Sequence, residues 1–148
     1  MHRVEKSLIV PYPAEQMFEL VADVGSYPQF VPGCKSAAVE AVSERTVEAT
    51  LRVSAGPFRQ RFTTRNTLTP PERIDMALVE GPFRALTGTW FFGVGEEGGT
   101  LIRLRLEFAF RSALLARTMA PAFGQMARRM VEAFAARARE IAAGAGRG

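Results

Sequence analysis

The sequence is poor in the residues on which many catalytic and metal sites depend. Its 148 residues include one cysteine, Cys34, and one histidine, His2. A single cysteine excludes an internal disulfide, and one cysteine with one histidine cannot complete a structural zinc site. Nucleophilic catalysis of the Ser-His-Asp or Cys-His kind needs a histidine beside the nucleophile. Neither Asp23 nor Asp75 forms an evident pair with a glutamate. We therefore expect no metal site, no catalytic residue and no enzymatic activity.

Long apolar runs and targeting signals are absent too. No stretch reaches the roughly 18 consecutive apolar residues that a membrane span requires, and the first residues lead into an alternating segment rather than a signal peptide. The composition, 47% hydrophobic and 23% charged, is typical of a globular chain long enough for one core. We expect one domain over residues 1–143, a disordered tail over 144–148, and a cytoplasmic protein that can contact the inner face of the membrane peripherally.

Positive charge is concentrated at one end of the chain. The formal net charge is +4, but residues 1–110 carry −1, whereas residues 111–148, with seven arginines and two glutamates, carry +5. Lys6 and Lys35 are the only lysines among 19 basic residues, which is compatible with arginine-biased codon usage. The other interpretation is an anionic partner such as RNA or a lipid surface. We expect no DNA partner.

The pattern of apolar residues predicts a mostly antiparallel β protein. Alternation with a period of two, bounded by Pro and Gly turns, predicts strands over residues 3–10, 35–42, 46–53, 58–68, 73–79, 86–94 and 100–110. Two short helices are expected between the first two strands, over 14–22 and 26–30. A long helix is expected over 112–143, with Ser112 as its N-cap and with a kink or an interruption at Pro121.

The long helix carries an apolar stripe at spacings of three and four residues. Its members are Met119, Phe123, Met126, Met130, Ala133, Phe134 and Ile141. A sheet with one apolar face needs a cover, and this helix is large enough to supply it. The prediction is an α+β helix-grip fold, with a curved antiparallel sheet of six to seven strands around the C-terminal helix. A dimer seam is the alternative for the stripe, although the sheet would then lack a cover.

Several segments resemble a known superfamily in order and over nearly the whole chain. They are residues 18–24, 27–34, 81–86, 90–92, 106–112, 130–134 and 137–138. The motif Tyr-Pro-x-Phe-x-Pro-x-Cys in residues 27–34 is the most specific of these segments for the superfamily. The chain resembles the START-like (helix-grip) superfamily. Within it, the chain is similar to the family of coenzyme Q-binding proteins and ribosome-association toxins, also labelled polyketide cyclase/dehydrase-type. The position before the cysteine is often Trp in that family and is Gly33 here.

The resemblance implies a hydrophobic cavity between the sheet and the long helix. It implies binding of ubiquinone or a polyprenyl precursor, as a carrier or chaperone for respiratory electron transport or quinone biosynthesis, with no cofactor required. The alternatives are a toxin-like protein that binds the ribosome and blocks association of its subunits, and a polyketide cyclase-type enzyme. The low histidine content favours a binding protein over a cyclase.

The candidate ligand-binding residues combine the helix stripe with inward strand positions. They are Phe30, Trp90, Phe92, Leu104, Leu106, Phe108, Met119, Phe123, Met126, Met130, Phe134 and Arg137. A Pro-flanked lip is expected to form the pocket lid, from Tyr27, Pro28, Val31 and Pro32. The stripe is compatible with ordinary core packing as well as with a wall for a flexible chain. Arg137 is either a snorkelling residue at the end of the stripe or a polar anchor for a head group. Cys34 is expected to be a buried apolar residue.

Two basic surfaces complete the predictions. One would lie on the outer face of the sheet if the strands that carry it are neighbours, with Arg59, Arg61, Arg65, Arg103 and Arg105. The other would be the back of the long helix, with Arg117, Arg128, Arg129 and Arg139. Each is either a solvated face neutralised by nearby glutamates or a contact surface for ribosomal RNA or anionic lipid.

Overall fold

The element order follows the predicted order closely. The computed structural model describes residues 1–147. It contains β1 (His2–Val10), α1 (Ala14–Ala22), the 3-10 helix η1 (Val24–Gln29), β2 (Cys34–Ser43), β3 (Thr46–Ala55), β4 (Phe58–Thr69), β5 (Arg73–Glu80), β6 (Phe83–Val94), the short turn η2 (Glu96–Gly98), β7 (Thr100–Phe110) and α2 (Ala113–Arg147). The predicted strands are confirmed, with ends that move by a few residues. The largest shift is the start of β6, at Phe83 instead of Leu86.

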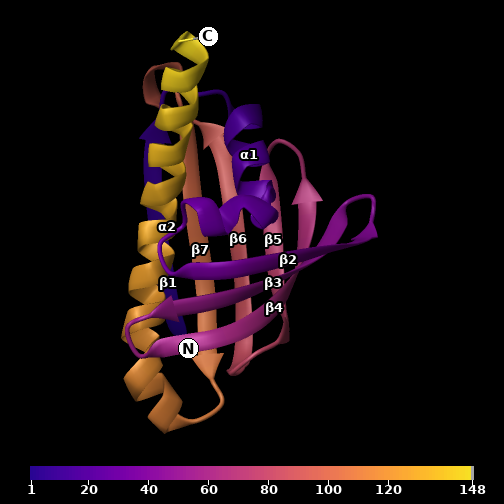
Figure 1. Cartoon of the computed structure of the whole chain (residues 1–148), viewed down its shortest axis with the longest axis vertical. Coiled ribbons are helices and arrows are strands. Elements are labelled where there is room, and N and C mark those ends of the chain that lie inside the picture. The colour runs from indigo at the N-terminus through magenta and orange to yellow at the C-terminus, as the bar shows by residue number, and fades with distance from the viewer. Residues whose placement is uncertain (148) are drawn as a thin grey trace.

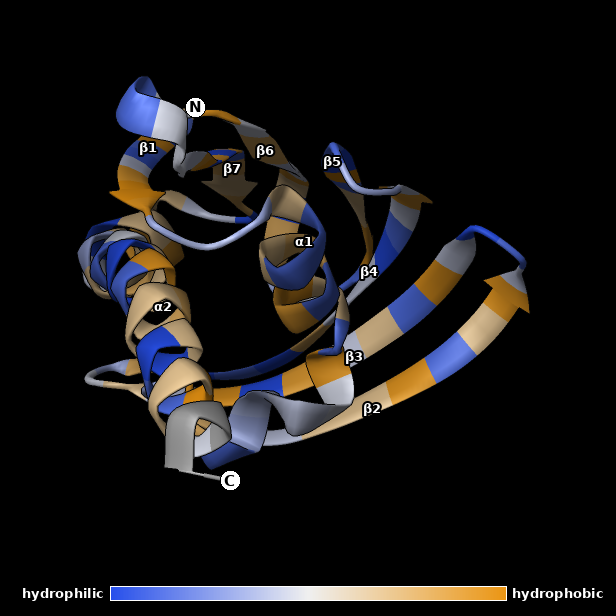
Figure 2. Ribbon diagram, turned by 90° about the horizontal axis from the view of Figure 1, so that it is seen from above, coloured by the Kyte–Doolittle hydropathy of each residue, from blue (hydrophilic) through white to orange (hydrophobic). Residues whose placement is uncertain are grey.

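The strands form one curved antiparallel sheet in the order β1-β7-β6-β5-β4-β3-β2. Consecutive strands from β2 to β7 pair by hairpins, and β1 closes the sheet beside β7 (Figure 1). Strands that alternate between apolar and polar residues bury one face and leave the other to solvent. Seen along its length, the sheet curls around α2 and α1 on its concave side (Figure 2). The predicted helix-grip fold is confirmed.

The long helix covers the concave face over β1 and β7 and runs as one element through Pro121. Ser112 caps it as predicted, because its Oγ accepts a hydrogen bond from the Leu115 N–H at 3.1 Å. Pro121 lies inside the helix and is exposed, and α2 continues on both sides of it although proline cannot donate a helical hydrogen bond. The predicted interruption is therefore not found. The helix extends beyond the predicted end at Ala143 to Arg147, and the last residue of the predicted tail, 148, lies outside the described residues.

The buried stripe of α2 differs from the predicted one. Its centre consists of small and medium side chains at Ala120, Gly124, Ala127, Val131 and Ala138, with Phe123, Met126 and Phe134 beside them. Ile141 is 45% exposed, contrary to the prediction. A Cβ added to Gly124 would lie 3.5 Å from Cγ2 of Val4. The helix thus presses its smallest residues against β1, and its large side chains lie over the middle of the sheet. Phe123, Met126 and Phe134 are buried within the same chain, so these three residues of the stripe do not form a dimer seam.

A cluster of phenylalanines fills one end of the concave face. Its members are Phe58, Phe62, Phe83, Phe108, Phe110 and Phe123. The rings of Phe108 and Phe123 have centroids 4.8 Å apart in an edge-on arrangement, which is a favourable aromatic geometry. This cluster fills the end of the grip where β4 and β6 begin.

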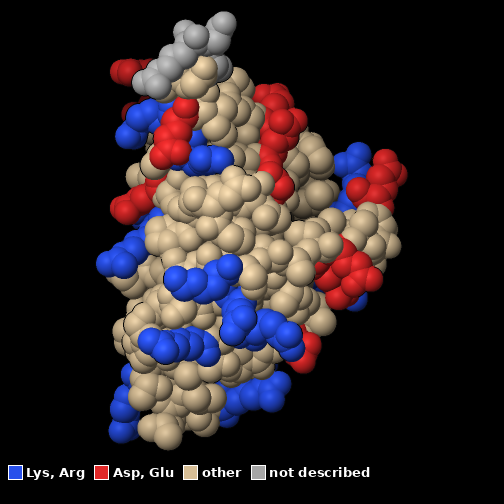
Figure 3. Space-filling view, viewed as in Figure 1, with Lys and Arg blue, Asp and Glu red and all other residues tan. Residues whose placement is uncertain are grey.

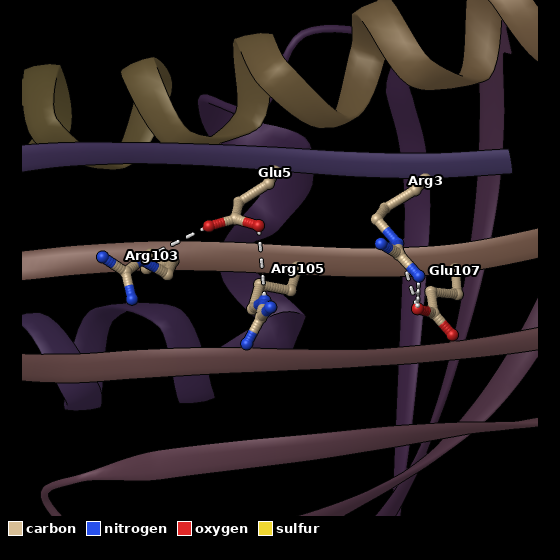
Figure 4. A network of polar contacts seen from close by, with 5 residues as sticks. All are labelled: Arg3, Glu5, Arg103, Arg105 and Glu107. Atoms are coloured by element: carbon tan, nitrogen blue, oxygen red, sulfur yellow. Dashed lines mark hydrogen bonds and ion pairs between the residues drawn. The ribbon is translucent and has the colours of Figure 1, made fainter.

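The outer face of the sheet does not form the first predicted basic surface. β4 and β7, which carry the arginines in question, are separated by β5 and β6. Arg65 pairs with Glu48 at 2.6 Å, and Arg105 lies 3.4 Å from Glu5. Glu5 also lies 3.8 Å from Arg103, in a row of alternating charges on β1 and β7 (Figure 4). Pairing with acidic residues thus compensates Arg65 and partly compensates Arg103 and Arg105.

Candidate ligand cavity

The structure contains an apolar cavity between the sheet, α2 and η1. Its volume is about 70 Å³. Its lining comes from η1 (Val24, Tyr27), β3 (Ala49, Leu51), β4 (Phe62, Thr64, Asn66), β5 (Met76), β6 (Leu86, Trp90), β7 (Leu104, Leu106) and α2 (Phe123, Met126, Ala127, Met130). No lining side chain carries a charge. The cavity is therefore suited to a neutral apolar group.

Two buried polar side chains lie in the apolar lining. Thr64 and Asn66 follow Phe62 at every second position of β4, so all three lie on its inward face. Thr64 is 7% exposed and Asn66 is 6% exposed. Thr64 Oγ1 donates a hydrogen bond to Asn66 Oδ1 at 2.8 Å. Buried polar groups are costly unless paired, so this pair is the chemically distinctive part of the cavity.

The 3-10 helix η1 forms the lip above the cavity. The Tyr27 hydroxyl donates to the Val21 carbonyl, and the Tyr27 ring packs edge-on against Phe134 at 5.2 Å between centroids. Burial, with smaller effects from the nearby Cys34 and Asp23, raises the pKa of the Tyr27 phenol above its usual range. The phenol stays neutral and serves as a structural donor.

Arg137 contacts the lip and not the cavity. Its Nη2 donates to Gln29 Oε1 and its Nη1 to Glu140 Oε2, both at 3.3 Å. Its guanidinium carbon lies 5.2 Å from the centre of the Phe30 ring, within the range of a cation–π interaction. Arg137 thus joins α2 to η1. The sequence alone indicated two other roles for it, a snorkelling residue and a polar anchor for a ligand head group.

Cys34, at the start of β2, is buried as predicted. Its Sγ donates to the Ser36 carbonyl at 3.6 Å. Burial raises the pKa of its thiol, so the reactive thiolate is disfavoured at neutral pH.

The structure brings part of the predicted site together. The predicted residues that line the cavity are Tyr27, Trp90, Leu104, Leu106, Phe123, Met126 and Met130. The others lie elsewhere. Phe30 and Phe134 pack against each other behind the lip, and Phe92 packs against Phe18 of α1. Phe108 belongs to the phenylalanine cluster, Met119 lies at the edge of α2 beside Gln60, and the segment around the lip contains Pro28, Val31 and Pro32. The candidates were chosen because they face the interior, and this criterion alone does not distinguish residues that line the cavity from residues packed in the core.

Several lining residues were missed by the sequence reasoning. They are Val24, Ala49, Leu51, Phe62, Thr64, Asn66, Met76, Leu86 and Ala127. The signal for Thr64 and Asn66 was available. Phe58 and Phe62 mark the inward face of β4, and the same alternation places polar residues at 64 and 66 on that face. A polar pair on an otherwise apolar face is a useful marker of a binding site.

A second hollow lies on the surface next to the cavity. It has a volume of about 280 Å³ and is lined by Pro32, Gly33, Ser54, Ala55, Gly56, Ala122, Gln125, Met126 and Arg129. Met126 belongs to both linings, so the surface hollow and the cavity adjoin at this residue. The main chain at Gly33 has φ +84°, a conformation that favours glycine.

Within residues 1–147, no group of three or more His, Cys, Asp and Glu side chains could hold a metal ion. Over the same residues, none of the helices combines the length and the apolarity needed to cross a bilayer.

The fold and the cavity define a START-like helix-grip protein. The sequence matches the family described as polyketide cyclase / dehydrase and lipid transport over residues 10–135, and the chain belongs to that family. Among solved structures, the 18 kDa protein CC1736 from Caulobacter crescentus has a TM-score of 0.78 and 34% identity, with 97% of this chain and 99% of that chain covered. The Zhui aromatase/cyclase from Streptomyces sp. R1128 has a TM-score of 0.84 over 93% of both chains. At 19% identity it shows the fold alone.

Curated relatives carry several different names. The ribosome association toxin RatA of Vibrio cholerae is 42% identical over 141 residues, which cover 95% of this chain and 98% of that protein. The mitochondrial coenzyme Q-binding protein COQ10 homolog B of Xenopus laevis is 27% identical over 140 residues, which cover 92% of this chain and 57% of that protein. The resemblance stated from the sequence is confirmed.

Proposed function

We propose that this protein binds a hydrophobic small molecule in the cavity between its sheet and α2, and that the ligand is ubiquinone or a polyprenyl precursor. The observation that carries the proposal is an apolar cavity that contains one buried polar pair, Thr64 and Asn66. Ligand sites are typically apolar hollows with a few placed polar groups. The relative named as a coenzyme Q-binding protein supports the choice of ligand.

Binding of a quinone ring requires the cavity to enlarge. Its volume of about 70 Å³ is roughly half of the ~150 Å³ in which an apolar cavity holds benzene. Met76, Met126 and Met130 line it, and unbranched methionine side chains can rearrange around a ligand. Movement of Met126 would join the cavity to the surface hollow, which gives the polyprenyl tail a route to solvent or to a membrane surface.

We propose a carrier or chaperone role without bond-making chemistry. The described cavity lining has no carboxylate and no imidazole to transfer a proton. Affinity would come from buried apolar area, at about 25 cal/mol per Å².

Organic extraction and mass spectrometry of the protein purified from a quinone-producing host test this function. We expect a co-purified quinone and a rise in melting temperature when a short-chain quinone is added. Protein that carries no quinone and gains no stability would contradict the proposal.

A second candidate is association with the ribosome, as the name of the Vibrio cholerae relative says of that protein. The structural observation in its favour is a like-charge pair. Arg52 on β3 lies directly opposite Arg61 on β4, both are exposed, and within residues 1–147 neither forms an ion pair. Like charges across a strand pair are unfavourable and suit an anionic partner. Basic side chains also gather over the end of the molecule that holds the β3–β4 turn (Figure 3).

Co-sedimentation with ribosomes at increasing salt tests the second candidate. We expect the double variant R52Q/R61Q to reduce ribosome binding several-fold at low salt and to flatten its salt dependence. The matched control is R103Q/R105Q, which removes the same charge from arginines that already face Glu5. Equal binding by both double variants would exclude the β3–β4 face.

A further inference from the structure

We propose that the cavity recognises its ligand through a neutral oxygen acceptor, and that the side-chain amide of Asn66 is the donor. The proposal rests on the ligand-binding function above and adds the chemical feature that is recognised. The class of ligand is an apolar molecule whose buried end carries a carbonyl or ether oxygen.

The orientation of the Asn66 amide follows from its neighbour. Thr64 Oγ1 donates to Asn66 Oδ1 at 2.8 Å, so the amide oxygen is directed along β4 toward Thr64. The two N–H groups of Nδ2 are therefore left on the other side of the amide. Among the described residues, no side-chain or main-chain acceptor receives a hydrogen bond from them. Asn66 is 6% exposed and lines the cavity, so its free donors are available to a ligand there.

The surroundings of Asn66 offer no other partner. Across the strands it faces Met76, which in turn faces Gly88. Trp90 also lines the cavity, at 2% exposure, and its indole N–H has no hydrogen-bond acceptor among the described residues. The Tyr27 hydroxyl already donates its hydrogen bond to the Val21 carbonyl.

The cavity therefore has free donors and no charge. A carbonyl oxygen satisfies a buried donor, whereas a hydrocarbon leaves it unpaired, and a buried unpaired donor is costly. A carboxylate or ammonium head would remain uncompensated in this lining. The polarity of the cavity thus fits a neutral acceptor.

The test compares two ligands on two proteins. The ligands are a decyl-substituted benzoquinone and decylbenzene, which share the tail and differ in the ring oxygens. Affinity is measured by quenching of the fluorescence of Trp90, the single tryptophan, and by calorimetry. We expect Asn66→Leu to weaken quinone binding by about tenfold, and not to weaken decylbenzene binding. For each ligand, the affinity of the variant is compared with that of the wild type. The difference in hydrophobicity between the two ligands then cancels.

Two further variants keep the test decisive. Thr67→Leu, on the exposed face of the same strand, should leave both affinities unchanged. Thr64→Val removes the bond that orients the amide and should reduce quinone affinity by a smaller factor, even if Asn66→Leu fails to fold. Equal losses for the two ligands, or no loss for the quinone, would overturn the role of Asn66. Failure of the wild-type protein to bind either ligand would instead overturn the proposed function, and with it this inference.

Discussion

Arg137 on α2 lies over the ring of Phe30, with 5.2 Å between its guanidinium carbon and the ring centre, and so connects the C-terminal helix to the lip. The Phe30 ring packs in turn against Phe134 of the same helix, with centroids 5.4 Å apart. The lip is thus held by one charged and several aromatic contacts. The side chain of Arg137 is partly open to solvent, at 30% exposure, which limits the strength of its contacts.

Replacement of Arg137 should loosen the lip without unfolding the protein. We expect Arg137→Gln to cost about 0.5–1 kcal/mol of stability, the usual size of a partly exposed cation–π contact. Amide hydrogen exchange should become faster in residues 24–30 and stay unchanged in the sheet. Arg139→Gln, at an exposed position on the same helix, is the control. Uniform acceleration of exchange across the chain would show that the effect is not local.

Truncation of Met126 should open the internal cavity to the surface hollow. We expect Met126→Ala to cost about 2–5 kcal/mol, as for other large-to-small core changes, and to raise the association rate of a quinone ligand in stopped-flow fluorescence. Met119→Ala removes the same atoms at the partly buried edge of α2 and should cost less stability with no change in that rate. Equal rates in the two variants would mean that Met126 does not block the entrance.

A methyl group at Gly88 should fill the cavity from the sheet side. A Cβ built there would lie 2.8 Å from Cε of Met76 and nearer still to Cδ2 of Leu106. These are the flexible ends of two lining side chains, so Gly88→Ala should push them into the cavity. We expect ligand affinity to fall several-fold with a modest change in melting temperature. Gly93→Ala, on the same strand with open space around its Cβ, should change neither quantity.

Stability should decline at alkaline pH in part because of Cys34. Its thiol has a pKa above the ordinary value of 9.0 when the protein is folded, so the unfolded chain loses this proton first. The free energy of unfolding should therefore fall as pH rises through 9.0 toward the folded-state pKa. Denaturant titrations between pH 7 and pH 10 should show a smaller decline in Cys34→Ala than in the wild type. An identical pH dependence would mean that the thiol does not contribute.

The strand pattern was predictable because strands such as β3, β4 and β7 have one covered and one solvated face. Residues such as Leu104 and Leu106 alternate with Arg103 and Arg105, and this period of two sets both the strand and its buried face. Turn residues, including Gly98 with φ +87°, mark the ends. The resemblance in residues 27–34 then indicated how these elements assemble.

The stripe of α2 was harder to predict because hydrophobicity is a poor guide to helix contact. Met119 and Ile141 are more apolar than Gly124, yet Gly124 is buried and Ile141 is exposed. Close approach to β1 requires small residues, and steric fit rather than polarity decides which residues meet the sheet.

The sequence by itself determined the elements, their order and the apolar concave face. These depend on local periodicity and on composition, which need no knowledge of distant residues. Only the tertiary structure decided where the cavity lies, that the phenylalanine cluster fills one end of the grip, and that Arg137 joins the lip. It also decided that Glu5 faces two arginines. Each of these depends on which residues from distant parts of the chain meet, and that is set by strand order, sheet curvature and packing.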